Sequence, residues 1–145
     1  MANKSLLVDI DLCVGCFACV VACKQEHNLP SGVQRIRIVQ EGPMKVDSKL
    51  TMRFVPIYCQ HCESPPCIES CPVGAISKRL DGIVLFDKRL CNGCKSCIEV
   101  CPFKAIQYDP EKNIADACDL CIERIKEGLE PSCVLVCPTG SLKLS

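Results

Sequence analysis

The sequence predicts an α+β fold built from two nested modules, with a β-hairpin inserted between them. Three observations lead to this prediction: the cysteines fall into four blocks, short cysteine-to-proline segments repeat along the chain, and two alternating segments flank one breaker. Sixteen of the 145 residues are cysteine, whereas the chain has four Phe, two Tyr and no Trp. Aromatic side chains usually dominate core burial, so we expect something other than side chains to fill much of the interior.

The four cysteine blocks have related spacings. Blocks one and three share C-x2-C-x2-C-x3-C, block two is C-x2-C-x4-C-x3-C, and block four is C-x2-C-x11-C-x3-C. A proline follows the last cysteine of blocks two, three and four, in CPVGAI, CPFKAI and CPTGSL, whereas Lys24 follows block one. The blocks are Cys13, Cys16, Cys19 and Cys23; Cys59, Cys62, Cys67 and Cys71; Cys91, Cys94, Cys97 and Cys101; and Cys118, Cys121, Cys133 and Cys137.

This spacing suits clusters of iron and sulfide. In C-x2-C-x2-C three thiolates of one loop can converge on a single cage, and C-x3-C-P carries a fourth thiolate to a neighbouring cluster, as in bacterial ferredoxins. Proline ends the helical turn and frees the chain to reverse. Four blocks then supply sixteen ligands for four [4Fe–4S] clusters, which uses every cysteine of the chain.

The distance between blocks predicts how they pair. Blocks two and three together have the size of a bacterial ferredoxin, so we expect them to form an inner module (57–109). Blocks one and four then pair by elimination in an outer module (1–32 and 110–145), and residues 33–56 form the inserted hairpin, a possible docking element. The expected ligand sets are Cys13, Cys16, Cys19 and Cys137; Cys118, Cys121, Cys133 and Cys23; Cys91, Cys94, Cys97 and Cys71; and Cys59, Cys62, Cys67 and Cys101.

Two other uses of cysteine compete with this interpretation. Zinc is the main rival, because block four alone resembles a pair of zinc knuckles across a long spacer. A disulfide framework needs an oxidising compartment, and the N-terminus, MANKSLLVDIDLC, is too short and too charged for a secretory signal. We therefore expect a cytoplasmic chain without a membrane span, although export while bound to a signal-bearing partner stays open.

Four segments, three between the blocks and one within block four, predict local structure. The alternating segments RIRIVQ (35–40) and MRFVPIY (52–58) flank a Gly42-Pro43 breaker, which predicts a β-hairpin. GIVLF (82–86) predicts a short buried strand. Residues 118–128 predict a helix ended by Gly128, with a stripe of Cys118, Cys121, Ile122 and Ile125.

The remaining composition argues against other functions. Seventeen basic residues balance seventeen acidic ones, and no basic stripe suggests nucleic-acid binding. No phosphate-binding glycine loop, nucleophile elbow or HExxH motif is present, so we expect electron transfer rather than catalysis. Because the four ligand sets are complete, His27 is expected to be a capping or surface residue and His61 a loop or supporting residue. Basic residues near the blocks either offset the cluster charge or are solvated surface groups: Lys24, Lys88, Arg89, Lys95 and Lys104.

Nearly the whole chain resembles one family. CVGCFACVVACKQEHNLP, CQHCESPPCIESCP and CDLC…PSCVLVCP are similar to segments of the four-cluster iron–sulfur subunits of molybdopterin oxidoreductases, including those of dimethyl-sulfoxide-reductase-type enzymes. The resemblance implies the nested pairing and a row of clusters that connects a large molybdenum- or tungsten-pterin subunit to a second redox subunit or soluble carrier. A free polyferredoxin shuttle, or a subunit of a carbon monoxide dehydrogenase or hydrogenase, remains the alternative.

Overall fold

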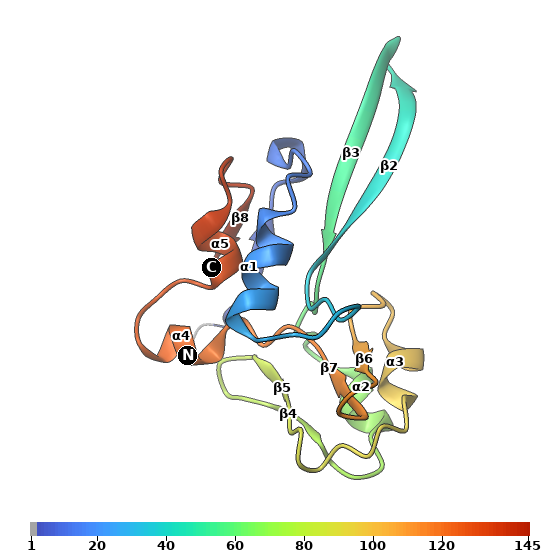
Figure 1. Cartoon of the computed structure of the whole chain (residues 1–145), viewed down its shortest axis with the longest axis vertical. Helices are drawn as coiled ribbons and strands as arrows, with labels where there is room; N and C mark the ends of the chain where they lie inside the picture. Colours follow the sequence, from blue (N-terminus) through green and yellow to red (C-terminus); the bar gives the residue numbers. More distant parts are fainter. Residues whose placement is uncertain (1–2) are drawn as a thin grey trace.

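The computed structural model describes residues 3–145, which form four two-stranded antiparallel sheets and several short helices (Figure 1). The sheets pair β1 (Leu6–Val8) with β8 (Leu142–Leu144), β2 (Arg37–Val46) with β3 (Lys49–Ile57), β4 (Ile76–Lys78) with β5 (Val84–Phe86), and β6 (Gln107–Asp109) with β7 (Ile114–Asp116). The helices are the 3-10 helix η1 (Ile10–Leu12), α1 (Ala18–Glu26), α2 (Pro66–Ser70), α3 (Ser96–Val100), α4 (Ile122–Lys126) and α5 (Ser132–Val136). This mixture of short helices and strands agrees with the predicted α+β class.

The two ends of the chain form one half of the body. Strands β1 and β8 pair from Leu6 opposite Leu144 to Val8 opposite Leu142, and helix α1 packs against α5. The ladder continues outward, where the Ser145 N–H donates to the Ser5 carbonyl oxygen at 2.9 Å. The core of this half is apolar and consists of Leu6, Cys19, Val20, Cys23, Ile36, Tyr58, Ile83, Leu120, Ile122, Cys133 and Leu142.

The middle of the chain forms the other half. Helix α2 packs against α3, and the sheets β4–β5 and β6–β7 lie beside them (Figure 1). Its smaller core consists of Cys67, Ile76, Val84, Cys97, Ile106, Ala115 and Ala117. The predicted strand at residues 82–86 is observed as β5, and Ile83 and Val84 are almost completely buried.

The hairpin β2–β3 projects from the body (Figure 1). It reverses at Asp47 and Ser48, which both have positive φ, as hairpin turns of two residues require. The Gly42-Pro43 breaker does not make the turn, because it lies inside β2, where the register shifts between Glu41 and Met44. Gly42 has φ +111°, and a Cβ there would lie 2.8 Å from the Thr51 carbonyl oxygen. The breaker therefore makes a bulge in a longer strand.

The helix predicted over residues 118–128 is shorter than expected. Helix α4 has five residues, and Cys118 and Cys121 belong to the loop before it rather than to an apolar helical stripe. Leu120 and Cys121 have positive φ, which keeps this loop out of the helix. Gly128 follows the helix with φ +77°, so the predicted end of the helix is confirmed.

Candidate metal centres

Four cavities, each lined by four cysteines, lie inside the body. Cavity 1 is lined by Cys13, Cys16, Cys19 and Cys137, and cavity 2 by Cys23, Cys118, Cys121 and Cys133. Cavity 3 is lined by Cys59, Cys62, Cys67 and Cys101, and cavity 4 by Cys71, Cys91, Cys94 and Cys97. Each set takes three cysteines from one sequence block and one from another, in the combinations expected from the spacing.

The four cavities each offer four cysteine side chains. Apart from the cysteines, the linings of cavities 1, 3 and 4 are mainly apolar, whereas the lining of cavity 2 also includes His27, Arg35, Asp119 and Ser132. All sixteen cysteines are free thiols. Four thiols that line one cavity suit an iron–sulfur cube. A zinc site within block four does not fit, because Cys137 lines cavity 1 whereas Cys118 and Cys121 line cavity 2.

The cysteine loops turn their sulfurs inward through left-handed backbone positions. In the first loop Gly15 and Phe17 have φ +68° and +63°. In the equivalent loop of block three, Gly93 and Lys95 have φ +74° and +66°. The two loops of equal spacing therefore curl in the same way, and positive φ at a non-glycine residue is unfavourable unless the surroundings hold it.

Helices carry cysteines into neighbouring cavities. Cys19 and Cys23 both lie on α1, one turn apart, yet Cys19 lines cavity 1 and Cys23 lines cavity 2. Cys133 in α5 and Cys137 at its C-cap repeat this arrangement in the reverse order. Helices α2 and α3 connect cavities 3 and 4 in the same way.

The repeated segment after the proline supplies hydrogen bonds to sulfur. In CPVGAI the Ala75 N–H donates to Cys71 Sγ at 3.3 Å, and in CPFKAI the Ala105 N–H donates to Cys101 Sγ at 3.5 Å. The Ala115 N–H likewise donates to Cys91 Sγ at 3.3 Å. Such bonds favour the thiolate and tune the potential of a bound cluster.

Burial disfavours the charged thiolate form of several cysteines when no metal is bound. It raises the pKa of Cys19 to about 11 and the pKa values of Cys23 and Cys133 to about 12. These thiols are neutral at neutral pH in the absence of metal, so cluster assembly must release protons. At Cys23 the positive charge of Arg35 opposes the effect of burial on the pKa.

Only two of the sixteen cysteines are exposed. They are Cys16 in cavity 1 and Cys94 in cavity 4. The cysteines of cavities 2 and 3 are all buried or half-buried. Cavities 1 and 4 therefore each have one cysteine that is exposed to solvent.

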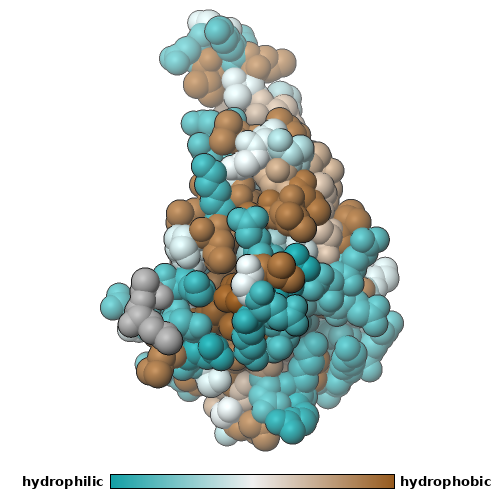
Figure 2. All heavy atoms as spheres, turned by 90° about the vertical axis from the view of Figure 1, so that its left-hand side faces the viewer, coloured by the Kyte–Doolittle hydropathy of each residue, from teal (hydrophilic) through white to brown (hydrophobic). Residues whose placement is uncertain are grey.

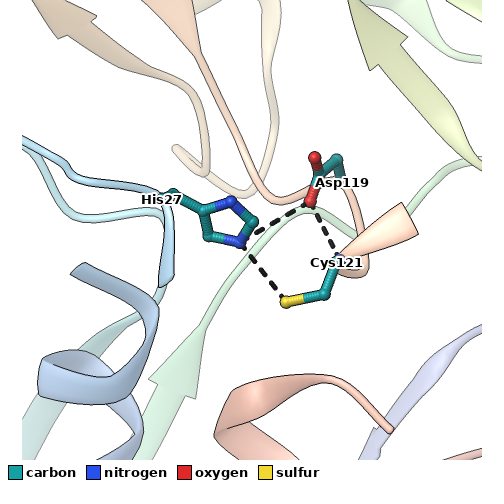
Figure 3. A group of neighbouring side chains, drawn as sticks. All are labelled: His27, Asp119 and Cys121. Carbon is teal, nitrogen blue, oxygen red and sulfur yellow. Dashed lines mark hydrogen bonds and ion pairs between the residues drawn. The ribbon is translucent and has the colours of Figure 1, made fainter. Parts of the chain in front are cut away.

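The two histidines contact different partners. His61 is buried, and its Nδ1 accepts the Val84 N–H at 2.9 Å, so the proton of the neutral ring is on Nε2. Burial lowers the pKa of His61 to about 4, and among residues 3–145 no acceptor meets its Nε2. His27 is the C-cap of α1, as predicted, and its Nε2 lies 3.3 Å from Cys121 Sγ and 3.9 Å from Asp119 Oδ1 (Figure 3).

The most buried cation is one that the sequence did not single out. Arg35 is 5% exposed and lines cavity 2, and it precedes β2 in the segment RIRIVQ that predicted part of the hairpin. Lys24 instead donates to the carbonyl oxygens of Pro30 and Val33, at 3.0 Å each. The other predicted cations are all exposed: Lys88, Arg89, Lys95 and Lys104.

These cavities define a polyferredoxin-like iron–sulfur protein. Two models described as 4Fe-4S dicluster domains match residues 12–75 and 50–145. The chain is 41% identical over 140 residues to the thiosulfate reductase electron transfer subunit PhsB of Salmonella typhi, covering 95% of this chain and 73% of the relative. It is 40% identical over 145 residues to a polysulfide reductase chain of Wolinella succinogenes, covering 98% and 76%. It is 37% identical over 142 residues to a tetrathionate reductase subunit of Salmonella typhimurium, covering 94% and 55%.

The chain thus belongs to the family of iron–sulfur electron-transfer subunits with two 4Fe-4S dicluster domains. The family membership predicted from the cysteine segments is confirmed. Two dicluster domains with sixteen cysteines correspond to four [4Fe–4S] clusters. Within the described part of the chain, every helix is too short or too polar to cross a membrane.

Proposed function

We propose that this chain carries electrons between a molybdenum- or tungsten-pterin catalytic subunit and a second redox partner, with one cluster in each cavity. The four cysteines that line a cavity are its ligands, and each bound cluster supplies one redox centre. The relatives support the role, because one is named as an electron transfer subunit of a reductase and two others as components of reductases.

The proposed modules are nested. The outer module, residues 1–32 and 110–145, provides the cysteines of cavities 1 and 2, and the inner module, residues 57–109, provides those of cavities 3 and 4. Strand β7 of the outer range nevertheless packs in the inner half, where Ala115 lines cavity 4. Residues 33–56 are the insertion that contains most of the hairpin. The shared helices support this division, because α1 and α5 each contribute to both outer cavities.

The cavities give the clusters a proposed order. Cavities 1 and 2 share α1, and cavities 3 and 4 share α2 and α3. The halves meet at Tyr58, whose hydroxyl donates to the Leu6 carbonyl oxygen at 2.9 Å. Leu6 lines cavity 2, and the neighbour of Tyr58, Cys59, lines cavity 3. The row therefore runs from cavity 1 through 2 and 3 to 4.

The pattern of exposed cysteines is the observation that carries this proposal. Cys16 and Cys94, the exposed cysteines, belong to the first and the last cavity of the row. Electrons can then be exchanged at both ends of the row, where one cysteine ligand is exposed. Short hops between neighbouring clusters replace one transfer across the whole molecule.

The end with Cys16 is the proposed docking face for the catalytic subunit. Exposed apolar side chains surround it, and they are Leu12, Val14, Phe17, Leu135 and Val136. Figure 2 views the side that carries α5, and hydrophobic side chains gather there around the base of the hairpin, whereas the opposite end is mostly hydrophilic. Permanent subunit interfaces are typically more apolar than ordinary surfaces. The hairpin adjoins this face, because Phe54 packs on Gly15.

The copurifying partner tests the proposed function. The tagged chain, isolated without oxygen from its own host, should bring down a large subunit that contains pterin-bound molybdenum or tungsten. A monomer that several unrelated enzymes reduce and reoxidise would support the polyferredoxin shuttle instead. A partner with carbon monoxide dehydrogenase or hydrogenase activity would support the other alternative. The cytoplasmic location expected from the sequence remains a prediction, which fractionation of the same host would check.

A further inference from the structure

A buried ionic group lies against cavity 2. Arg35 and Asp116 are 5% and 3% exposed, and they form a bidentate pair. Arg35 Nε lies 3.1 Å from Asp116 Oδ2, and Arg35 Nη2 lies 3.0 Å from Asp116 Oδ1. A fork of this kind fixes the orientation of the guanidinium group. The remaining nitrogen, Nη1, is therefore held in a defined place.

That nitrogen is incompletely satisfied. Arg35 Nη1 lies 3.2 Å from Asp119 Oδ1, so the two are an ion pair, but the geometry is not that of a hydrogen bond. Within residues 3–145 no acceptor takes an Nη1 hydrogen, and the atom is buried. A buried donor without an acceptor is costly, and such groups usually have an unseen partner. Because Arg35 lines cavity 2, that cavity can provide the acceptor.

A second side-chain donor meets the same cavity. His27 Nε2 lies 3.3 Å from the sulfur of Cys121 (Figure 3). A metal-bound thiolate only accepts hydrogen bonds, so the Nε2–H of His27 is the donor. Asp119 Oδ1 holds the loop in place by accepting the Cys121 N–H at 2.9 Å. His27, Asp119 and Cys121 lie close enough to hold a separate ion, but the sulfur already belongs to cavity 2.

The other cavities lack this combination. Among the residues that line cavities 1 and 3 there is no Lys, Arg or His. Cavity 4 has Lys95, which is exposed and lies over the ring of Tyr108, 4.2 Å from its centre. A solvated cation acts weakly on a neighbouring charge, whereas a buried one acts strongly.

We infer that Arg35 and His27 are positioning residues that raise the reduction potential of the cluster in cavity 2. This inference rests on the ligand sets proposed above. Reduction adds a negative charge to the cluster, so a buried cation and an N–H donor to sulfur stabilise the reduced form. Asp116 and Asp119 hold Arg35 against the cavity, and their two negative charges outnumber its single positive charge. Without Arg35 both carboxylates would face the cluster unpaired, so its presence keeps the potential higher than it would otherwise be. The second cluster of the row is therefore tuned separately from the first.

Redox titration followed by electron paramagnetic resonance tests the inference. The signal of cavity 2 is first identified as the one that Cys133→Ala removes. Arg35→Gln should lower the equilibrium constant for reduction of that cluster at least tenfold, about 59 mV for one electron, and change the others little. Lys126→Gln removes a charge of the same sign from an exposed site on α4, and should leave all four potentials unchanged.

Histidine variants keep the test decisive if Arg35→Gln prevents assembly. His27→Phe keeps a ring but removes the donor, so it should lower the same potential, and His27→Gln should restore part of it. An unchanged potential in His27→Phe, or a shift shared by all four clusters, would overturn the inference. If Cys133→Ala removes no single signal, the ligand assignment fails instead, which separates the two failures.

Discussion

Tyr58 donates a 2.9 Å hydrogen bond from its hydroxyl to the backbone carbonyl oxygen of Leu6, and both side chains are buried. The bond connects the first strand of the chain to the residue before Cys59. It therefore joins the part that lines cavity 2 to the part that lines cavity 3.

Replacing Tyr58 by Phe should weaken this junction. A buried hydrogen bond contributes about 1 kcal/mol, so the variant should unfold at a lower temperature while its cluster spectrum stays the same. Thermal unfolding at a fixed scan rate measures the change. The matched control is Tyr108→Phe, which removes a hydroxyl bonded to Asn113 near the surface. If the two variants lose the same stability, Tyr58 has no special role at the junction.

The loss of a cluster signal in single cysteine variants should depend on which cavity the cysteine lines, not on its sequence block. Cys71→Ala and Cys97→Ala lie in different blocks but line cavity 4, so both should remove the same cluster signal. Cys67→Ala shares a block with Cys71 but lines cavity 3, so it should remove a different signal. Electron paramagnetic resonance of the reduced protein checks both outcomes. Identical spectra for the Cys67 and Cys71 variants would refute the crosswise ligand sets.

Gly15→Ala should disturb cavity 1 through the hairpin. A Cβ at Gly15 would lie 2.5 Å from the ring of Phe54, and the residue has φ +68°. Positive φ costs an alanine about 1–2 kcal/mol, and the clash adds to this cost. Gly74→Ala is the control, because Gly74 has φ +64° but no atom within 4 Å of the added Cβ. Gly15→Ala should be the less stable variant by thermal unfolding; equal stability would mean that the Phe54 contact is unimportant.

Shortening the hairpin should abolish partner binding but not cluster assembly. Replacement of residues 42–52 by Asn-Gly keeps the pair of Glu41 with Arg53 and closes it with a favoured two-residue turn. The shortened protein should retain its iron and its spectra but no longer copurify with the catalytic subunit. The proposed docking role is wrong if the complex forms as before. Leu50→Lys, at an exposed position near the tip, provides a milder variant for the same assay.

The sequence was most informative where cysteines are spaced regularly. The spacing within one block fixes which sulfurs one loop or helix can present, and the four expected sets each line a single cavity. Their role as ligands is still a proposal. The strands of the α+β class could also be predicted. A strand as short as β5 needs only a few apolar residues, and the segment GIVLF supplies them.

Features that depend on tertiary contacts could not be predicted in this way. Gly42 and Pro43 suggested a turn, but pairing on both sides of them continues β2, and the turn lies at Asp47 and Ser48. Arg35 lies in an alternating segment, and its burial depends on ion pairs with the distant Asp116 and Asp119. The sequence pattern around Arg35 cannot indicate that Asp116, 81 residues away, is its partner.

Iron and acid-labile sulfide analysis of the anaerobically purified protein is the most direct test that four clusters occupy the four cavities. The expected result is about sixteen irons and sixteen sulfides per chain, four of each per cluster, without stoichiometric zinc. A folded, colourless protein free of iron would contradict it.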